Sequence, residues 1–198
     1  MDLQSAAAAL EQVEPYRGRL EPVMLPSGAV LLRDDFSDDF CTLEPALQVL
    51  RNAVARRRIL IVSGVLDPLS KTNARFSELG ETVAHAADLI AFVGEDSAAH
   101  AQAAIASGMD PENVRSFPAL PEAAEFLKSN LHDGDLALLR GYLMDHVQRL
   151  YFAQLGTVSC WIQSCSKQIL CDHCPELRPG LENAAAVPSP VRPFWHPL

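Results

Sequence analysis

The sequence has no apolar run long enough to cross a membrane, because a spanning helix needs about 20 consecutive apolar residues. Its N-terminal stretch, MDLQSAAAALEQVEP, carries acidic residues and lacks the basic segment that opens a secretory signal. These two absences predict a protein that resides in the cytoplasm and has no membrane partner.

Positive charge is also scarce. The chain has 16 Lys and Arg residues against 25 Asp and Glu residues, for a formal net charge of −9. A broad nucleic-acid surface needs clustered cations, so we expect no nucleic-acid partner. The single basic cluster, Arg56 to Arg58, falls where a predicted helix ends and a buried strand begins. Cations there complement the helix dipole, so a helix terminus is the preferred interpretation and a phosphate contact is the alternative.

The composition does not indicate disorder either, since 48% of the residues are hydrophobic and only 21% are charged. With 198 residues, the chain can form one sizeable domain plus an appendage. We therefore expect a folded core followed by a less regular C-terminal region.

Strand-like and helix-like segments alternate along most of the chain. Continuous apolar runs such as ILIVS and LIAFV are typical of strands buried on both faces, and a Pro-Ser-Gly turn near residue 27 favours a hairpin. We predict strands at 21–25, 29–32, 59–63, 89–93, 114–117 and 136–139, and helices at 2–13, 42–55, 71–87, 97–108, 121–130 and 143–155. This order predicts an α/β fold, namely a Rossmann-like, mostly parallel sheet with helices on both faces.

The same patterns divide the chain into four parts. We predict an N-terminal helix and linker at 1–20, the α/β domain at 21–156, a small Cys-rich appendage at 157–180 and a Pro-rich tail at 181–198. The strand ends at Asp34, Gly64, Gly94 and Arg140 should lie along one edge of the sheet. A site within the domain is expected at that edge.

An acidic loop follows the first long strand. The apolar residues from Val30 to Leu32 end in four carboxylates, and an amphipathic helix follows them. Ligands of α/β proteins gather at the carboxyl ends of strands, beside the N–H groups of the next helix. The loop is therefore a candidate site. A solvated acidic turn, with Thr42 as an ordinary helix cap, is the alternative. The four carboxylates are Asp34, Asp35, Asp38 and Asp39.

Four of the five cysteines are crowded into fifteen residues near the end of the chain, with the spacing C-x4-C-x5-C-x2-C. Its last part, Cys-Asp-His-Cys, is a short knuckle that lets two thiolates reach one tetrahedral ion. We expect a metal site, with zinc first and an iron–sulfur cluster as the alternative, or else free or redox-active thiols. His173 is a reserve ligand, and the other five histidines show no metal spacing. The predicted ligands are Cys160, Cys165, Cys171 and Cys174.

The order of these motifs resembles the C-terminal domain of the Mur ligases, especially the MurF-type branch that adds D-alanyl-D-alanine to UDP-N-acetylmuramoyl-tripeptide. The family's D-D-x-Y-N-A-N-P-x-S-M pattern corresponds to the stretch from Arg33 through Leu43. The family's V-G corresponds to Val93 and Gly94, and its D-x-V-L-V-K-G-S to the sequence DLALLRGY from Asp135. The resemblance extends over about three quarters of the chain.

The resemblance implies which residues carry the chemistry. Asp34 is implied to orient an amine or a ribose hydroxyl. Arg140, in place of the family's lysine, would offset the charge of a substrate carboxylate or phosphate. Both are candidate catalytic residues. The candidate cofactor-binding residues in the same motifs are Asp35, Asp38, Gly141 and Tyr142.

No phosphate-binding G-x-G-K-T/S sequence occurs in the chain, although the family holds ATP and magnesium with such a loop. We therefore expect a separate partner with a Mur ligase central domain to hold ATP and magnesium. The first helix resembles the last helix of that domain. Two hypotheses follow. In the first, the chain is a subunit of a split ATP-dependent amide ligase that acts on a small amine or amino acid. In the second, it is a non-catalytic binding or scaffolding module that keeps the fold.

Overall fold

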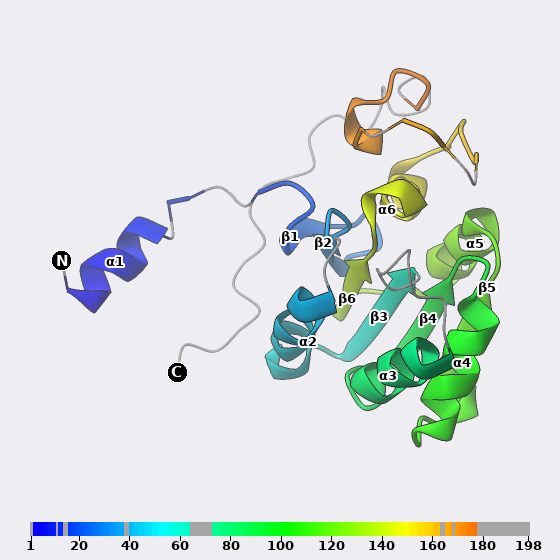
Figure 1. Cartoon of the computed structure of the whole chain (residues 1–198). Helices are drawn as coiled ribbons and strands as arrows, with labels where there is room; N and C mark the ends of the chain where they lie inside the picture. Colours follow the sequence, from blue (N-terminus) through cyan, green and yellow to red (C-terminus); the bar gives the residue numbers. More distant parts are fainter. Residues whose placement is uncertain are drawn as a thin grey trace.

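Six strands in the described part of the chain form one mixed sheet (Figure 1). The computed structural model describes residues 2–10, 12–13, 16–37, 40–63, 73–162, 165–167 and 169–177, with the backbone alone for residue 40 and residues 73–77. Strand β1 is antiparallel to β2, and every other neighbouring pair is parallel. The strands, in sheet order, are β1 (Glu21–Met24), β2 (Val30–Asp34), β6 (Asp135–Arg140), β3 (Arg57–Ser63), β4 (Leu89–Val93) and β5 (Val114–Phe117).

The hairpin predicted near the start of the domain is confirmed. Glu21 of β1 pairs with Arg33 of β2, and Met24 pairs with Val30. The turn between them contains Gly28, whose φ of 84° lies in the left-handed region that favours glycine. The Pro-Ser-Gly pattern thus specifies the connection between the two strands.

Six α-helices lie in the described ranges, and the helical patterns predicted for two of them begin within short 3-10 turns. Short 3-10 turns, η1 (Phe40–Thr42) and η3 (Leu143–Asp145), precede α2 and α6. Thr42 makes no side-chain cap on α2, because its hydroxyl accepts a hydrogen bond from Arg140 instead. The helices are α1 (Leu3–Leu10), α2 (Leu43–Asn52), α3 (Asn73–Val83), α4 (Ser97–Ala106), α5 (Leu120–Asn130) and α6 (Gln148–Leu155).

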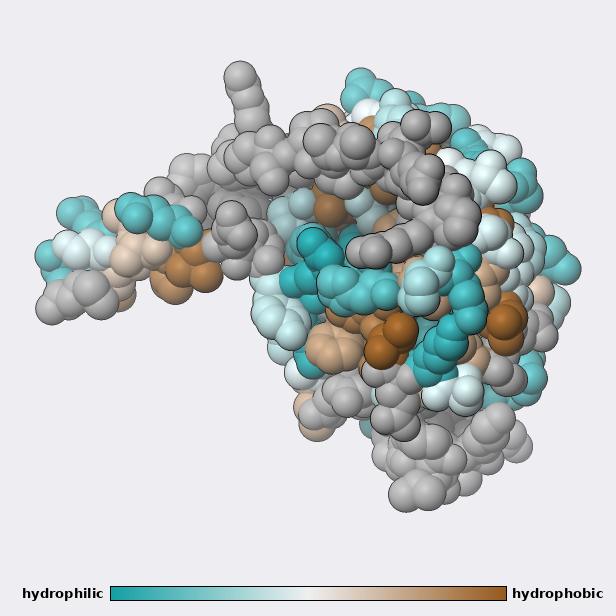
Figure 2. Space-filling view, turned by 90° about the horizontal axis from the view of Figure 1, so that it is seen from above, coloured by the Kyte–Doolittle hydropathy of each residue, from teal (hydrophilic) through white to brown (hydrophobic). Residues whose placement is uncertain are grey.

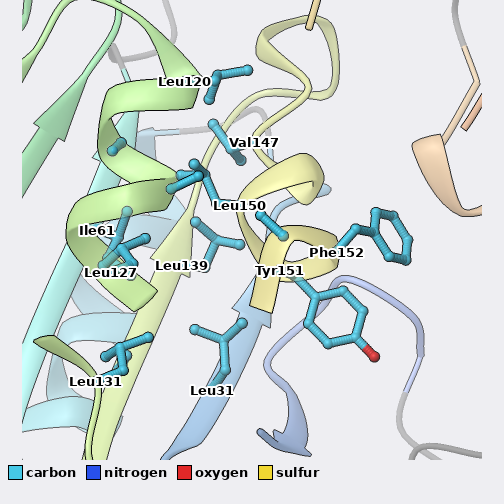
Figure 3. Close-up of a cluster of buried hydrophobic side chains, with 14 of the residues drawn as sticks. Leu31, Ile61, Leu120, Leu127, Leu131, Leu139, Val147, Leu150, Tyr151 and Phe152 are labelled. Carbon is cyan, nitrogen blue, oxygen red and sulfur yellow. The ribbon is translucent and has the colours of Figure 1, made fainter. Parts of the chain in front are cut away.

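The sheet separates two hydrophobic cores. Alternate residues of β3 point to opposite faces: Ile59 and Ile61 pack with α5 and α6, while Leu60 and Val62 pack with α2, α3 and α4. Figure 3 shows the first of these cores, where Leu139 of β6 lies between the two helices. The mostly parallel, doubly covered α/β fold predicted from the sequence is therefore confirmed.

The parallel strands end on the same side of the sheet (Figure 1). Asp34 ends β2, Ser63 ends β3 and Arg140 ends β6, as neighbouring strands in the order β2, β6, β3. Gly64, which the sequence places at the same edge, lies outside the described residues. No helix in the described ranges combines the length and apolar character needed to cross a bilayer.

Gly80 marks the close approach of α3 to α4. A β-carbon at this position would lie 2.5 Å from the carbonyl carbon of Ala103, which is backbone and cannot turn aside. Gly80→Ala should destabilise the fold, because overpacking costs about 1–3 kcal/mol and outweighs the helix-propensity gain of up to about 1 kcal/mol. Urea unfolding measures the difference. Glu81→Ala, an exposed change on the same helix, should stay within about 0.5 kcal/mol of the parent. A Gly80→Ala variant at least as stable as the parent would contradict this packing.

Candidate functional site

A buried ion pair joins the carboxyl ends of two neighbouring strands. Asp34 of β2 and Arg140 of β6 are register partners, and Arg140 Nη1 donates to Asp34 Oδ2. Only 3% of Asp34 and 1% of Arg140 are exposed. The structure thus brings together the two residues that the sequence proposes as catalytic.

Polar groups from the surrounding loops complete this pair. Asp34 Oδ1 accepts hydrogen bonds from Ser37 Oγ at 2.9 Å and from the Leu20 amide at 3.3 Å. Arg140 Nη2 donates to Thr42 Oγ1 at 2.6 Å, and Arg19 donates to Ser37 at 3.3 Å. The Asp34 carboxylate is therefore fixed in position by three donors from three parts of the chain.

A second polar pair lies beside the first at the ends of β3 and β6. Ser63 Oγ donates to Asp145 Oδ2 at 2.7 Å, and burial raises the pKa of the Asp145 carboxyl. A β-carbon on Gly141 would lie 2.7 Å from Ser63 Oγ and 2.4 Å from Val147 Cγ2, so only glycine fits there. Gly141 thus allows the loop after β6 to pack directly against the end of β3.

The helices that follow β3 and β6 in the chain pack on opposite faces of the sheet. The helix that follows β3, α3, packs on one face, and the helix that follows β6, α6, packs on the other. Open α/β sheets commonly bind ligands at such a reversal between neighbouring strands. Ser63, Asp145 and Gly141 line this position, and Asp34 follows one strand away. Figure 2 views the molecule from the side on which β3 and β4 end.

Asp35 faces away from this pair and takes part in a different buried cluster. Its carboxylate accepts from Arg33 Nε at 2.9 Å and from Arg33 Nη2 at 3.3 Å. Arg33 also binds both oxygens of Asp172, at 2.8 and 2.9 Å, and its guanidinium lies 4.6 Å from the centre of the Tyr151 ring. Figure 3 shows Tyr151 projecting from α6 beside Phe152. Burial raises the pKa of Asp35 to about 6, against the opposing charge of Arg33.

The Cys-rich segment packs against the same side of the domain. Cys171 and Cys174 are buried with Leu177 in the core formed by α5 and α6, whereas Cys160 and Cys165 are half-buried. Burial raises the pKa of the Cys171 thiol to about 11. No group of three or more His, Cys, Asp or Glu side chains among the described residues is already arranged to hold a metal ion. The metal site therefore stays a prediction.

The sequence-based candidates thus fall into three sets. Asp34, Arg140 and Gly141 gather at the ends of β2 and β6, and the half-buried Tyr142 follows directly. Asp35 lies in the Arg33 cluster, and Asp38 lies outside the described residues. Sequence reasoning missed Ser63 and Asp145. Ser63 could have been found as the polar end of the ILIVS run, but no spacing marks Asp145.

The fold and the polar pairs define a Rossmann-like domain whose buried polar residues gather at the carboxyl edge of a mostly parallel sheet. A profile of the family described as "Mur ligase, glutamate ligase domain" matches residues 18–143, more than half of the chain. The chain therefore belongs to the Mur ligase family, in which it corresponds to the C-terminal domain.

Solved Mur ligase structures share this fold. MurF from Acinetobacter baumannii matches 78% of the chain with a TM-score of 0.62 and 19% sequence identity. MurF from Thermotoga maritima in complex with ADP matches 72% with a TM-score of 0.58 and 12% identity. The chain spans only 34% and 31% of these two proteins, respectively. Among curated proteins, no relative matches the sequence.

A murein peptide ligase from Psychrobacter arcticus shows the same pattern, with a TM-score of 0.55 and 17% identity over 76% of the chain. Again, only 32% of the relative is covered. At these identities the likeness is one of fold, and the residues that act must be tested in this chain itself.

The raised pKa of Asp35 predicts a pH-dependent stability. Between about pH 4 and about pH 6 the folded state holds a proton on Asp35 that the unfolded state has released. The contribution of Asp35 to the free energy of unfolding therefore falls as the pH rises through this window, by about 3 kcal/mol. Urea unfolding at several pH values measures this effect. The free energy of unfolding of the parent minus that of the Asp35→Asn variant should decrease as the pH rises through this window.

Asp88 supplies a control of opposite sign. Its hydrogen bonds with Arg58 lower the pKa of its carboxyl, so its contribution to stability is present above the unfolded pKa and is lost as the pH falls. The difference in the free energy of unfolding between the parent and the Asp88→Asn variant should therefore become smaller as the pH is lowered. A parent minus Asp35→Asn difference that stays constant from pH 4 to pH 7 would show that Asp35 titrates normally.

Proposed function

We propose that the chain supplies the C-terminal lid of an ATP-dependent Mur-type amide ligase whose ATP-binding domain belongs to a separate polypeptide. The observation that carries the proposal is the fixed Asp34–Arg140 pair at the carboxyl edge of a Mur ligase domain. The substrate class is a small amine or amino acid that is joined to an activated carboxylate.

The residues of the site suit a supporting part in such a reaction. A fixed carboxylate such as Asp34 can orient an incoming amine, and Arg140 can offset negative charge on the acyl donor. The carboxylate and guanidinium already form a neutral, preorganised pair, so little rearrangement is needed when a partner domain closes over them. This polar edge does not fit ATP by itself, because the sequence has no phosphate-binding loop. ATP and magnesium are therefore assigned to the partner.

Helix α1 offers a contact surface for that partner. It has no buried residue and stands away from the rest of the described chain (Figure 1). Leu3 and Leu10 are 90% and 70% exposed, and Figure 2 shows hydrophobic residues on the projecting helix. An exposed apolar helix of this kind gains stability when a second surface covers it.

A non-catalytic binding or scaffolding module is the second candidate function. It is favoured by the burial of Asp34 and Arg140, whose charged groups satisfy each other and the adjacent loops. In that case the pair stabilises the fold, and the polar edge or α1 holds a partner without chemistry. The two functions differ in what the loss of the Asp34 charge does to turnover.

The ligase function predicts that Asp34→Asn lowers ATP-dependent amide formation by about 100-fold or more, because a fixed charge that orients or stabilises reacting groups is removed. The assay mixes the chain with the product of a neighbouring gene that encodes a Mur central domain, ATP and a panel of amines, and measures ADP and amide. Rates are normalised to the folded fraction from circular dichroism.

Asp88→Asn is the matched control, since it also removes a carboxylate paired with an arginine but lies at the opposite edge of the sheet. It should leave turnover unchanged. Full activity in Asp34→Asn, or no ADP with any partner and amine, would exclude the split-ligase function. Binding of the partner without turnover would favour the scaffolding module.

The surface of α1 is tested separately. Burial of one leucine side chain contributes about 1.5–3 kcal/mol, so replacing Leu3 and Leu10 by Glu should weaken partner binding by at least about 10-fold. Calorimetric titration measures the affinity. The thermal stability of the isolated chain should not change, because neither side chain packs on the domain. An unchanged affinity would place the partner elsewhere.

A further inference from the structure

The loop before α6 brings a histidine to the Cys-rich segment. His146 lies 25 residues ahead of Cys171 in the sequence, yet its Nδ1 is 3.4 Å from Cys171 Sγ, and both side chains are buried. A sulfur at about 2.3 Å and a nitrogen at about 2.0–2.1 Å from one tetrahedral zinc ion lie about 3.6 Å apart. The observed spacing is therefore close to that of two ligands on one ion.

The knuckle supplies further thiols at the same place. Cys174 follows Cys171 after a single 3-10 turn, in which the Cys174 amide donates to the Cys171 carbonyl at 3.1 Å. The backbone of Cys165 also interacts with the His146 ring. Cys171 thus contacts the imidazole directly, and Cys174 and Cys165 follow from the same segment of the chain.

A buried cation beside this cluster indicates an anionic occupant. Arg149 of α6 is 2% exposed, donates to the Ile162 carbonyl and lies against the Cys171 thiol. Within the described ranges no carboxylate forms an ion pair with it. A buried guanidinium without an anion costs several kcal/mol. Three thiolates, a neutral imidazole and one zinc ion carry a net charge of −1, which balances Arg149.

Cys160 has different surroundings. It packs with Trp161 against the hydrophobic core between α5 and α6, whereas the thiol that contacts the His146 ring is that of Cys171. The sequence spacing alone suggests Cys160 as the fourth ligand.

We propose that His146, Cys165, Cys171 and Cys174 bind one zinc ion and that Arg149 balances its charge. The side chains of Cys165 and Cys174 close on the ion when it binds, since the described side chains do not form a complete cage without it. Cys171 and His146 provide the half of the site that is already at ligand spacing. The centre fastens the segment after α6 to the domain, independently of any ligase activity.

The test is metal analysis of the purified full chain and of single variants. The parent should contain about one zinc per chain and no iron, and a chelator should remove the zinc and lower the melting temperature. His146→Gln and Cys165→Ser should lose the zinc, whereas the matched variant Cys160→Ser should keep it. Zinc retained by His146→Gln, or lost from Cys160→Ser, would overturn this ligand set.

Cobalt replacement gives a readout that needs no variant. Co²⁺ bound by the parent should show the visible bands of three sulfur ligands and one nitrogen, and a spectrum of four sulfur ligands would overturn the proposal. Arg149→Met should weaken zinc binding by about 10–100-fold, as loss of an outer partner does, and Arg149→Lys should restore most of it. A parent protein that binds neither zinc nor cobalt would also overturn the proposal.

Discussion

The guanidinium of Arg33 is the group on which the arrangement of this domain depends. It holds Asp35 and Asp172 by two hydrogen bonds each and lies over the Tyr151 ring, so one side chain joins β2, the loop after it, α6 and the knuckle. Charges as deeply buried as these are expensive, and loss of one partner of such a cluster costs about 3–5 kcal/mol. The cluster therefore fixes how the C-terminal segment packs, even where an apolar core would have been the more stable choice.

The direction of β2 connects this cluster to the candidate site. Arg33 and Asp34 are consecutive, so their side chains leave opposite faces of the strand: Arg33 toward α6, and Asp34 toward Arg140 and Thr42. A shift of β2 by one residue in register would turn Arg33 toward the candidate site and Asp34 toward the core cluster. The pairing of β2 with both β1 and β6 prevents that shift, and the position of Asp34 is as well determined as that of the core.

How far the sequence predicts this structure depends on the range of each interaction. Strands β4 and β5 match the predicted 89–93 and 114–117, because continuous apolar runs bounded by glycine or turn residues are local patterns. The start of α6 was predicted too early. His146 adopts a φ of 52°, and the turn that it forms leaves no local trace in an otherwise helical pattern. Asp34 and Arg140 could be proposed because each ends a recognisable strand. Asp172 and Arg33 are 139 residues apart in the sequence. Their contact depends on tertiary packing, which the local spacing of residues does not reveal.

The docking of the knuckle changes what counts as the end of the domain. A fragment that stops at residue 156 would keep every strand and α-helix that the structure describes. It would nevertheless lose Val158, Cys171 and Leu177 from the core and leave Arg33 with one of its two closest carboxylates. In energetic terms the folding unit extends at least to Leu177. Sequence alignments or expression fragments that trim the domain after its last α-helix would remove part of its interior.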